Sequence, residues 1–450
     1  RAQRSAANIL YLALSLTMAN SIKAIHASFL HCLANPDVGG QDVVQFIEHG
    51  TMLVANGKVI KLGTADSIDV PNNATVVDLS NKLVMPGFVD THIHFPQVDV
   101  IASYGTQLLD WLERYTFPEE SRYSDYELAE KTASFFLDEL LSNGTTTALV
   151  FGTVHPESVD AFFSQAAARN LRMICGKVMM DRNAPSNLTD TPESSFDDSQ
   201  RLINDWHDKG RLGYAVTPRF APTSSPEQLA MAQKLLDENP TVHLHTHMAE
   251  NGNECDWVRE LFPDAEDYLA VYEKYKLVRK RSVFAHSIHL SDNAWKRLAK
   301  DDAAVSHCPC SNLFIGSGLF DLRAAQKHSV KVGLGTDVGG GDSFSLLRAS
   351  NEAYKIQQLQ NHTLTPEHAF YLATLGGAKA LDLDNQIGNF EPGKEADFIV
   401  IDEQATPLIS RRTSSQTHWR DRLFTLLMLG DDRSIEQTWI MGEPYSPSSL

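Results

Sequence analysis

The chain has 450 residues, of which 42% are hydrophobic and 21% are charged, and its formal net charge is −18. This composition is typical of folded globular proteins and excludes an intrinsically disordered chain. The strong negative charge argues against nucleic acid and against anionic membrane surfaces as partners.

The N-terminal residues and the cysteines give information on the cellular compartment of the protein. Residues 1–17, RAQRSAANILYLALSLT, combine two arginines with an apolar run, as short targeting peptides do, and the run is too short to span a membrane. We interpret them as a leader or a disordered N-terminus ahead of Met18, because no small-x-small cleavage site follows. The five cysteines are scattered and odd in number, which argues against a disulfide framework and for a reducing compartment. We therefore expect a cytoplasmic protein.

Apolar, β-branched runs alternate with helical patterns through the middle of the chain. Residues 83–94 predict a first strand, and residues 127–144 predict a helix that ends at the C-cap signal Asn143-Gly144. Continuous apolar strands suit a parallel sheet that is buried on both faces, so eight such runs predict an α/β protein with a (β/α)₈ TIM-type barrel. The seven later strand candidates are TTTALVF, LRMICGKVMM, LGYAVTP, TVHLHTH, SVFAHSIHL, AAVSHCP and VKVGLGTD.

Both chain ends have a different pattern. Residues 50–63 contain an Asn-Gly hairpin signal between short apolar runs, and residues 388–402 join Gly and Pro punctuation to a β-type run. We expect the two ends to pair into one small β-sandwich domain that flanks the barrel. Residues 403–418, rich in Ser, Thr and Arg, are predicted to be a loop. The predicted boundaries are 18–84 and 385–450 for the small domain and 85–384 for the catalytic barrel.

Ligand-type side chains fall at the C-terminal ends of the predicted strands, which form the catalytic rim of such barrels. His92 and His94 end the first strand, His247 ends the fifth, His286 lies late in the sixth, and Asp337 ends the eighth. Three imidazoles (His92, His94 and His247) with the Asp337 carboxylate leave room for a water, as a catalytic zinc site requires. We expect one Zn²⁺ per chain, while Fe²⁺ fits the same ligand types.

Spacing alone does not show which histidine of the stretch HLHTHMAENGNE (243–254) is the third metal ligand. In a strand His243, His245 and His247 share one face at ~7 Å per step, so they cannot all bind one ion.

Several motifs together point to a known family. PGFVDTHIH, HTHMAE, FAHSIHLS, HCPCSN and GLGTDVGGG resemble the amidohydrolase superfamily. DTHIHFPQ, LLDWLERYTFPEESR, TPRF and HMAENGNE are similar, within it, to the guanine deaminase family, and the likeness runs from about Met18 to the C-terminus. One position departs from the family pattern, because Cys310 replaces the asparagine usual at the fourth position of HCPCSN. We expect Cys310 to be a small buried thiol without chemistry.

The resemblance implies a homodimeric hydrolase of purine catabolism that converts guanine and water to xanthine and ammonia. It makes His247 the third metal ligand, with His243 and His245 packed deeper in the barrel. It also suggests catalytic roles: Glu250 as the proton shuttle, Asp337 as ligand and base, and His286 as the group that orients the nucleophile and stabilises the developing charge.

Substrate recognition is assigned to five side chains: Gln97, Arg219, Phe220, Glu250 and His286. Gln97 offers a donor and an acceptor to a purine edge, and Arg219 offers a fork of donors to the guanine carbonyl. A structural ion pair for Arg219 and core packing for Phe220 remain open as alternatives.

Other functions stay open beside guanine deamination. One is an aminohydrolase of another purine, a pterin or a pyrimidine, which Gln97 with Arg219 argues against. Another is a non-catalytic scaffold built on the same barrel, which the complete set of ligand-type residues argues against. A deaminase zinc site of the H-x-E and P-C-x-x-C type is excluded, because position 313 is Leu where the second cysteine is needed.

Overall fold

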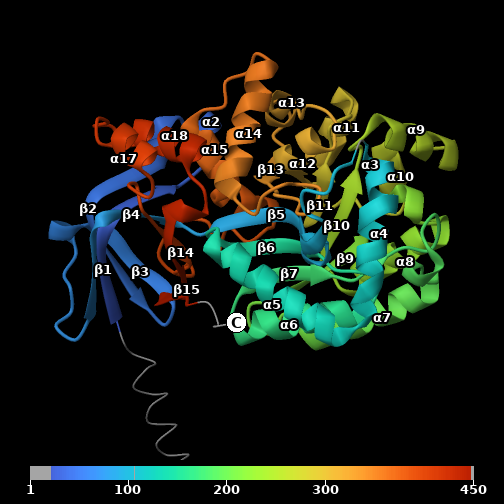
Figure 1. The fold of residues 1–450 in the computed structure, drawn as a ribbon, viewed down its shortest axis with the longest axis horizontal. Coiled ribbons are helices and arrows are strands. Elements are labelled where there is room, and N and C mark those ends of the chain that lie inside the picture. The colour runs from blue at the N-terminus through green and yellow to red at the C-terminus, as the bar shows by residue number, and fades with distance from the viewer. Residues whose placement is uncertain (1–21, 106, 447–450) are drawn as a thin grey trace, which may run out of the picture.

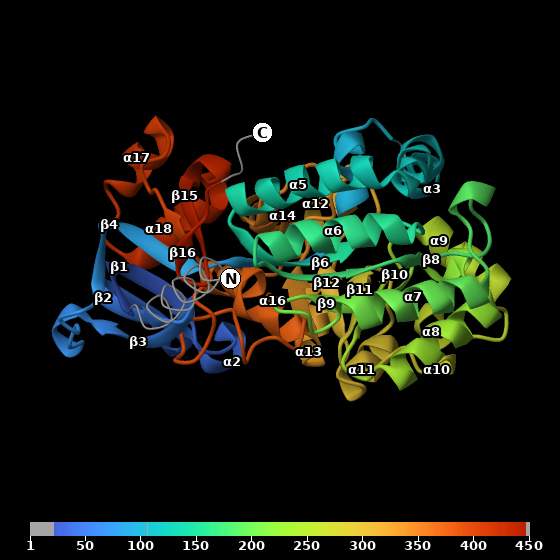
Figure 2. The ribbon, with the colours of Figure 1, turned by 90° about the horizontal axis from the view of Figure 1, so that it is seen from below.

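The computed structural model describes residues 22–105 and 107–446, which form two sheets lying end to end (Figures 1 and 2). One end holds the N-terminal strands, drawn in blue, together with the last strands, drawn in red, and the barrel fills the remainder. The predicted leader, residues 1–17, lies outside the described residues.

The larger sheet is the predicted barrel. Its eight principal strands pair in parallel in chain order, and the two-residue strand β8 (Val178–Met179) extends the pairing of β9. Every strand of the prediction is found, although LRMICGKVMM is divided between β7 and β8. The eight strands are β5 (Phe88–His94), β6 (Thr145–Phe151), β7 (Arg172–Gly176), β9 (Gly213–Pro218), β10 (His243–Met248), β11 (Ser282–His286), β12 (Ala304–His307) and β13 (Lys331–Leu334).

Hydrogen bonds at the C-terminal edge join the last barrel strand to the first. The Asp337 N–H donates to the His92 carbonyl oxygen at 2.9 Å, and the His94 N–H donates to the Val338 carbonyl oxygen at 2.9 Å. The segment after β13 is thereby fixed against β5. Barrel closure therefore brings His92 and His94 beside Asp337, although more than 240 residues separate them in the chain.

Amphipathic helices cover the barrel, and their caps match the sequence signals. The predicted helix 127–144 is α5 (Tyr126–Ser142), whose first turn is capped by the Asp125 carboxylate. It ends at Asn143-Gly144, where Gly144 has the left-handed φ of +79° that a C-cap glycine adopts. The other helices around the barrel are α6 (Pro156–Ala168), α7 (Pro192–Trp206), α8 (Pro226–Glu238), α9 (Gly252–Leu261), α10 (Tyr268–Lys274), α11 (Asp292–Lys300), α12 (Pro309–Phe314), α13 (Leu322–Lys327), α14 (Leu346–Leu359), α15 (Pro366–Ala373) and α16 (Leu375–Ala380).

The second sheet has seven strands and joins the two chain ends, as the sequence predicted. The hairpin turn is at Asn56-Gly57, whose φ values of 52° and 73° fit the predicted Asn-Gly signal. The predicted strand 83–94 is divided at Gly87, where a Cβ would lie 2.1 Å from the Thr146 side chain. Its first part belongs to this sheet and its second part begins the barrel. In spatial order the strands are β16 (Glu443–Pro444), β15 (Ile435–Ile440), β14 (Phe398–Ile401), β4 (Thr75–Pro86), β1 (Ile22–Cys32), β2 (Val44–Ala55) and β3 (Lys58–Thr64).

The loop predicted for residues 403–418 is wrong in part, because it contains helix α17 (Pro407–Thr413) ahead of α18 (Trp419–Leu429). The Thr406 hydroxyl accepts the Ile409 N–H and Pro407 occupies the first turn, so a Thr-Pro start signal outweighs the polar composition. No helix in the described parts of the chain has both the length and the apolar character needed to cross a bilayer.

Candidate active site

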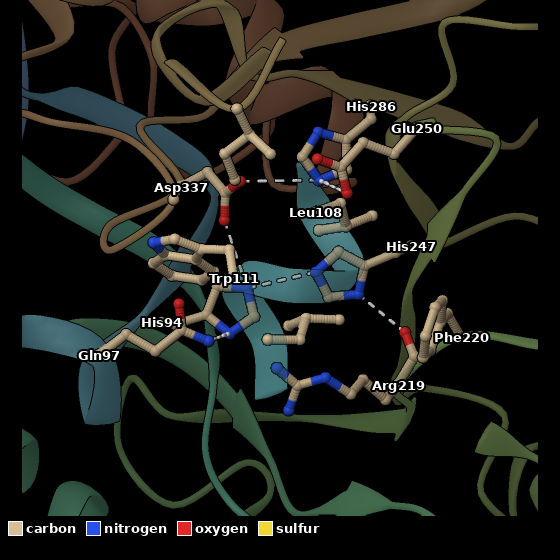
Figure 3. Close-up of a pocket in the computed structure, with 13 residues that line it drawn as sticks. His94, Gln97, Leu108, Trp111, Arg219, Phe220, His247, Glu250, His286 and Asp337 are labelled. Atoms are coloured by element: carbon tan, nitrogen blue, oxygen red, sulfur yellow. Dashed lines mark hydrogen bonds and ion pairs between the residues drawn. The ribbon is translucent and has the colours of Figure 1, made fainter. Parts of the chain in front are cut away.

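A pocket opens at the C-terminal ends of the barrel strands, where the sequence placed the catalytic rim (Figure 3). It is lined by all of the predicted site residues except His92, which lies directly behind His94. The polar lining consists of His94, Gln97, Arg219, His247, Glu250, His286 and Asp337, and the apolar lining includes Leu108, Trp111, Leu112, Phe220 and Ile315.

His92 and three of the lining side chains direct donor atoms at one point. His94 Nε2 lies 3.3 Å from His92 Nε2, 3.2 Å from His247 Nε2 and 3.3 Å from Asp337 Oδ1. His92 Nε2 lies 3.1 Å from the same Asp337 oxygen. Ligands at ~2.0–2.1 Å around a tetrahedral zinc are separated by roughly 3.3 Å, so the spacing of these four atoms fits a divalent ion.

The protonation of the histidines also fits a metal site. Burial lowers the pKa of His92, lowers that of His94 to about 4, and lowers that of His247 far below its ordinary value, so all three rings are neutral at neutral pH. The His247 Nδ1–H donates to the Arg219 carbonyl oxygen at 2.7 Å, which leaves the Nε2 lone pair facing the cluster. A neutral imidazole with its lone pair exposed is the form that binds a metal ion.

The two other histidines of β10 lie where the prediction put them. His245 Nε2 is 2.6 Å from His92 Nδ1, on the side of that ring away from the cluster. His243 lies deeper in the barrel and its Nε2 is 2.8 Å from the Leu381 carbonyl oxygen. Both are buried and hydrogen-bonded, which confirms that reading. His245 thus orients the His92 ring from behind, the role that a carboxylate or a backbone carbonyl more often fills for metal-binding histidines.

Glu250 and His286 face the cluster from the opposite wall. Burial, and after it the negative charge of Asp337, raise the pKa of Glu250 to about 8. The Ser317 hydroxyl donates to Glu250 Oε1 at 3.0 Å, and Glu250 Oε2 lies 3.4 Å from His286 Nε2. His286 Nδ1 is 2.8 Å from the Asn312 side-chain oxygen, which can only accept, so Nδ1 carries a proton. Glu250 therefore holds a proton near neutral pH beside an imidazole nitrogen.

His286 Nε2 is aimed into this cluster. Within the described ranges it has no hydrogen-bond partner, and His286 joins His92, His247 and Asp337 in a group whose potential ligand atoms lie within 4.8 Å of one another. A fully buried ring nitrogen of this kind is normally satisfied by a bound ion or water.

Three residues on the rim have the left-handed backbone conformation that side chains other than glycine rarely adopt. The φ angles are +50° at Ala249, +67° at His286 and +52° at Asp337. Each such residue costs on the order of 1 kcal/mol or more, and such strain gathers at functional sites. The strained strand ends turn Glu250, His286 and Asp337 toward the same cavity.

The side of the pocket away from Glu250 holds a buried polar chain of three residues. Arg219 Nη1 donates to Glu120 Oε2 at 2.6 Å, and Gln97 Nε2 donates to Glu120 Oε1 at 2.9 Å. The Gly339 N–H donates to Gln97 Oε1 at 3.2 Å. Arg219 therefore makes the ion pair that remained open as its alternative, while its guanidinium still lines the pocket (Figure 3).

Sequence reasoning missed Glu120 and the apolar cover of the pocket. Glu120 ends α4 (Phe117–Glu120), and Trp111 ends α3 (Leu108–Trp111), inside a motif that was used for the family resemblance only. Phe220 is 4% exposed and packs edge-on against Trp257 at 6.4 Å, so it is a core residue as well as a pocket wall. Cys310 is a buried thiol whose pKa burial raises.

Comparison with known proteins agrees with this geometry. Residues 83–444 match the model of the amidohydrolase family. The guanine deaminase of Escherichia coli (strain K12) is 52% identical over 428 residues, which cover 94% of this chain and 97% of that protein. The solved E. coli guanine deaminase superposes with a TM-score of 0.92 at 51% identity, covering 95% of this chain and all of that one.

A second solved structure, guanine deaminase from C. acetobutylicum with guanine bound in its active site, has a TM-score of 0.86 at 27% identity, covering 94% of this chain and 100% of that one. Matches that extend over nearly the whole of both chains leave no unmatched domain in the relatives. The chain therefore belongs to the amidohydrolase family and, within it, to the guanine deaminases.

Proposed function

We propose that this protein hydrolyses guanine to xanthine and ammonia. The observation that carries the proposal is the convergence in one pocket of four metal-type donor atoms, a carboxyl group that is protonated near neutral pH, and the Gln97–Glu120–Arg219 chain. The metal-type donor atoms and the protonated carboxyl group provide the chemistry of hydrolysis. The Gln97–Glu120–Arg219 chain recognises a purine that has a carbonyl group. Guanine is the molecule bound in the active site of the C. acetobutylicum relative.

We propose one Zn²⁺ or Fe²⁺ per chain, held by His92, His94, His247 and Asp337. Support comes from the 3.1–3.3 Å spacing of their donor atoms and from the neutral state of the imidazoles. When bound, a divalent ion makes a nucleophile available from water at neutral pH, where water alone is unreactive.

Glu250 and Asp337 carry out the proton transfers, and Asp337 is the first group to accept a proton. Asp337 takes the proton released by the attacking water. Glu250 gives its proton to a ring nitrogen of guanine, which makes the attacked carbon electrophilic. Glu250 then takes the proton of the newly added hydroxyl group and passes it to the departing amine, which leaves as ammonia. The proton held by Asp337 finally returns Glu250 to its protonated state. A pKa of about 8 suits a group that must both hold and release a proton near neutral pH. Because Asn312 occupies His286 Nδ1, Nε2 is free to orient the water and the developing tetrahedral centre.

Recognition uses the opposite wall. Arg219 donates to the carbonyl oxygen of guanine, and the Gln97 amide meets the adjacent ring edge. Trp111 and Phe220 are 2% and 4% exposed and form apolar walls for the planar ring, which keep bulk water away from the reacting carbon.

The family resemblance also supports proposals for the location, assembly and domain organisation of the protein. We propose a cytoplasmic homodimer, and the five unpaired cysteines are consistent with a reducing compartment. We also propose that residues 85–384 form the catalytic unit, with residues 18–84 and 385–450 as the supporting β domain.

A substrate panel tests the proposal. Purified protein should convert guanine to equal amounts of xanthine and ammonia and should act on adenine, cytosine and pterins at least about a hundredfold more slowly by kcat/KM, since a lost polar contact in a buried site has a large effect on rate. Preference for adenine or a pyrimidine would refute the assignment of guanine while leaving the hydrolytic site intact.

A further inference from the structure

We propose that Glu120 is a positioning residue that holds Arg219 and Gln97 in register and, by pairing with Arg219, keeps the recognition wall electrically neutral so that the neutral substrate is bound in preference to the anionic product. The inference deepens the proposed function and rests on it.

The placement of Glu120 is the first step. Its side chain is 1% exposed at the end of α4, and each carboxylate oxygen receives one hydrogen bond, from Gln97 Nε2 and from Arg219 Nη1. The Arg219 guanidinium carbon also lies 5.4 Å from the centre of the Phe117 ring, one turn earlier on the same helix. Helix α4 thus fixes the guanidinium by an ion pair and a cation–π contact together.

The second step concerns Gln97. Its nitrogen donates to Glu120 and also lies 3.1 Å from His94 Nδ1, while its oxygen accepts the Gly339 N–H, so the two ends of the amide cannot exchange places. Glu120 is therefore the one charged partner among three that fix the orientation of the amide facing the purine edge.

The third step concerns the charge of Arg219. Arg219 is the only Lys or Arg among the described residues that line the pocket, and Glu120 compensates its charge at 2.6 Å. A paired guanidinium still donates hydrogen bonds to a neutral carbonyl oxygen, but it exerts little net attraction on an anion. Deamination replaces an amino group by a second carbonyl, so xanthine gives up a ring proton more readily than guanine does. Without Glu120, the free cation would bind the xanthine anion and slow its release.

The decisive variant is Glu120→Gln, compared with Glu119→Gln on the same helix. Glu119 is half-buried and pairs with Arg122 outside the pocket. For each protein we would measure kcat and KM for guanine, metal content, and inhibition by xanthine and by hypoxanthine at mildly alkaline pH. Hypoxanthine is the matched control ligand, because it keeps the carbonyl but stays neutral.

We expect Glu120→Gln to raise KM for guanine about tenfold, because one amide cannot satisfy both partners, and to tighten xanthine inhibition on the order of tenfold through the uncompensated Arg219 charge. Hypoxanthine inhibition should not tighten, and metal content and the Glu119→Gln enzyme should match wild type. Weaker binding of guanine together with stronger inhibition by xanthine distinguishes this role from a purely structural one, because a structural defect would weaken the binding of every ligand.

Unchanged or weakened xanthine inhibition in an active Glu120→Gln enzyme would overturn the inference and leave the proposed function standing. If that variant does not fold, Arg219→Gln replaces it. That change leaves the Glu120 charge uncompensated, so xanthine inhibition should weaken more than hypoxanthine inhibition, and equal weakening would overturn the inference. A wild-type protein without guanine turnover would instead overturn the proposed function and this inference with it.

Discussion

Replacing Glu250 by Gln should make the metal-free protein more stable while stopping catalysis. The carboxyl has an ordinary pKa of 4.5, and burial together with the charge of Asp337 raises it to about 8. Between these values the unfolded chain releases the proton and the folded protein keeps it. The contribution of this carboxyl to stability is therefore most favourable below pH 4.5, and it is lost progressively as the pH rises toward 8.

The magnitude follows from the size of the shift. Each pKa unit is worth about 1.36 kcal/mol, so near neutral pH the raised pKa lowers the free energy of unfolding by roughly 3 kcal/mol. Glutamine has the same shape and no proton to lose. Its amide can donate to His286 Nε2 and accept from the Ser317 hydroxyl, so both neighbours of Glu250 keep partners.

Urea unfolding of metal-free wild type and Glu250→Gln, at mildly acidic and at neutral pH, measures the difference. The variant should be more stable at neutral pH by about 3 kcal/mol, and the gap should shrink toward zero in acid. In the metal-loaded enzymes kcat should fall ~10²–10⁴-fold with unchanged metal content. Glu260→Gln, at an exposed position of α9, should alter neither property. Equal stabilities at neutral pH would refute the burial argument, and near-normal turnover would refute the shuttle.

Three other changes probe the metal and the recognition wall. Chelation should abolish guanine turnover and lower the melting temperature, and added zinc or iron(II) should restore both; turnover that persists in fully metal-free protein would contradict the chemistry. His245→Ala removes the hydrogen bond to His92 Nδ1, so metal affinity in a competition titration should fall ~10–100-fold, and unaltered affinity would show that His245 only fills space. Arg219→Ala should raise KM for guanine by about tenfold or more with the metal retained, whereas metal loss would make Arg219 a structural residue.

The barrel was predictable because its strands are continuous apolar runs separated by helices with clear caps. The places where the prediction failed are local. Gly87 divides one apolar run between two sheets, at a point where Thr146 packs too closely for a side chain. In residues 403–418, polar composition hid a Thr-Pro helix start.

The metal-type residues could also be predicted from the sequence, since each lies at the end of a strand and parallel strands end at one rim. Glu120 could not be predicted in this way. It follows Glu119 directly, and the sequence gives no sign of which of the two acids is buried. Only the packing of α4 against the barrel turns Glu120 toward Arg219 and leaves Glu119 to pair with Arg122.

The central claim is that His92, His94, His247 and Asp337 hold one ion that guanine hydrolysis requires. The most direct measurement is a titration of metal-free protein with zinc while xanthine formation is followed. Our account predicts that turnover rises linearly and reaches its plateau at one ion per chain. Full turnover before any metal is added, or a plateau without turnover at that ratio, would contradict it.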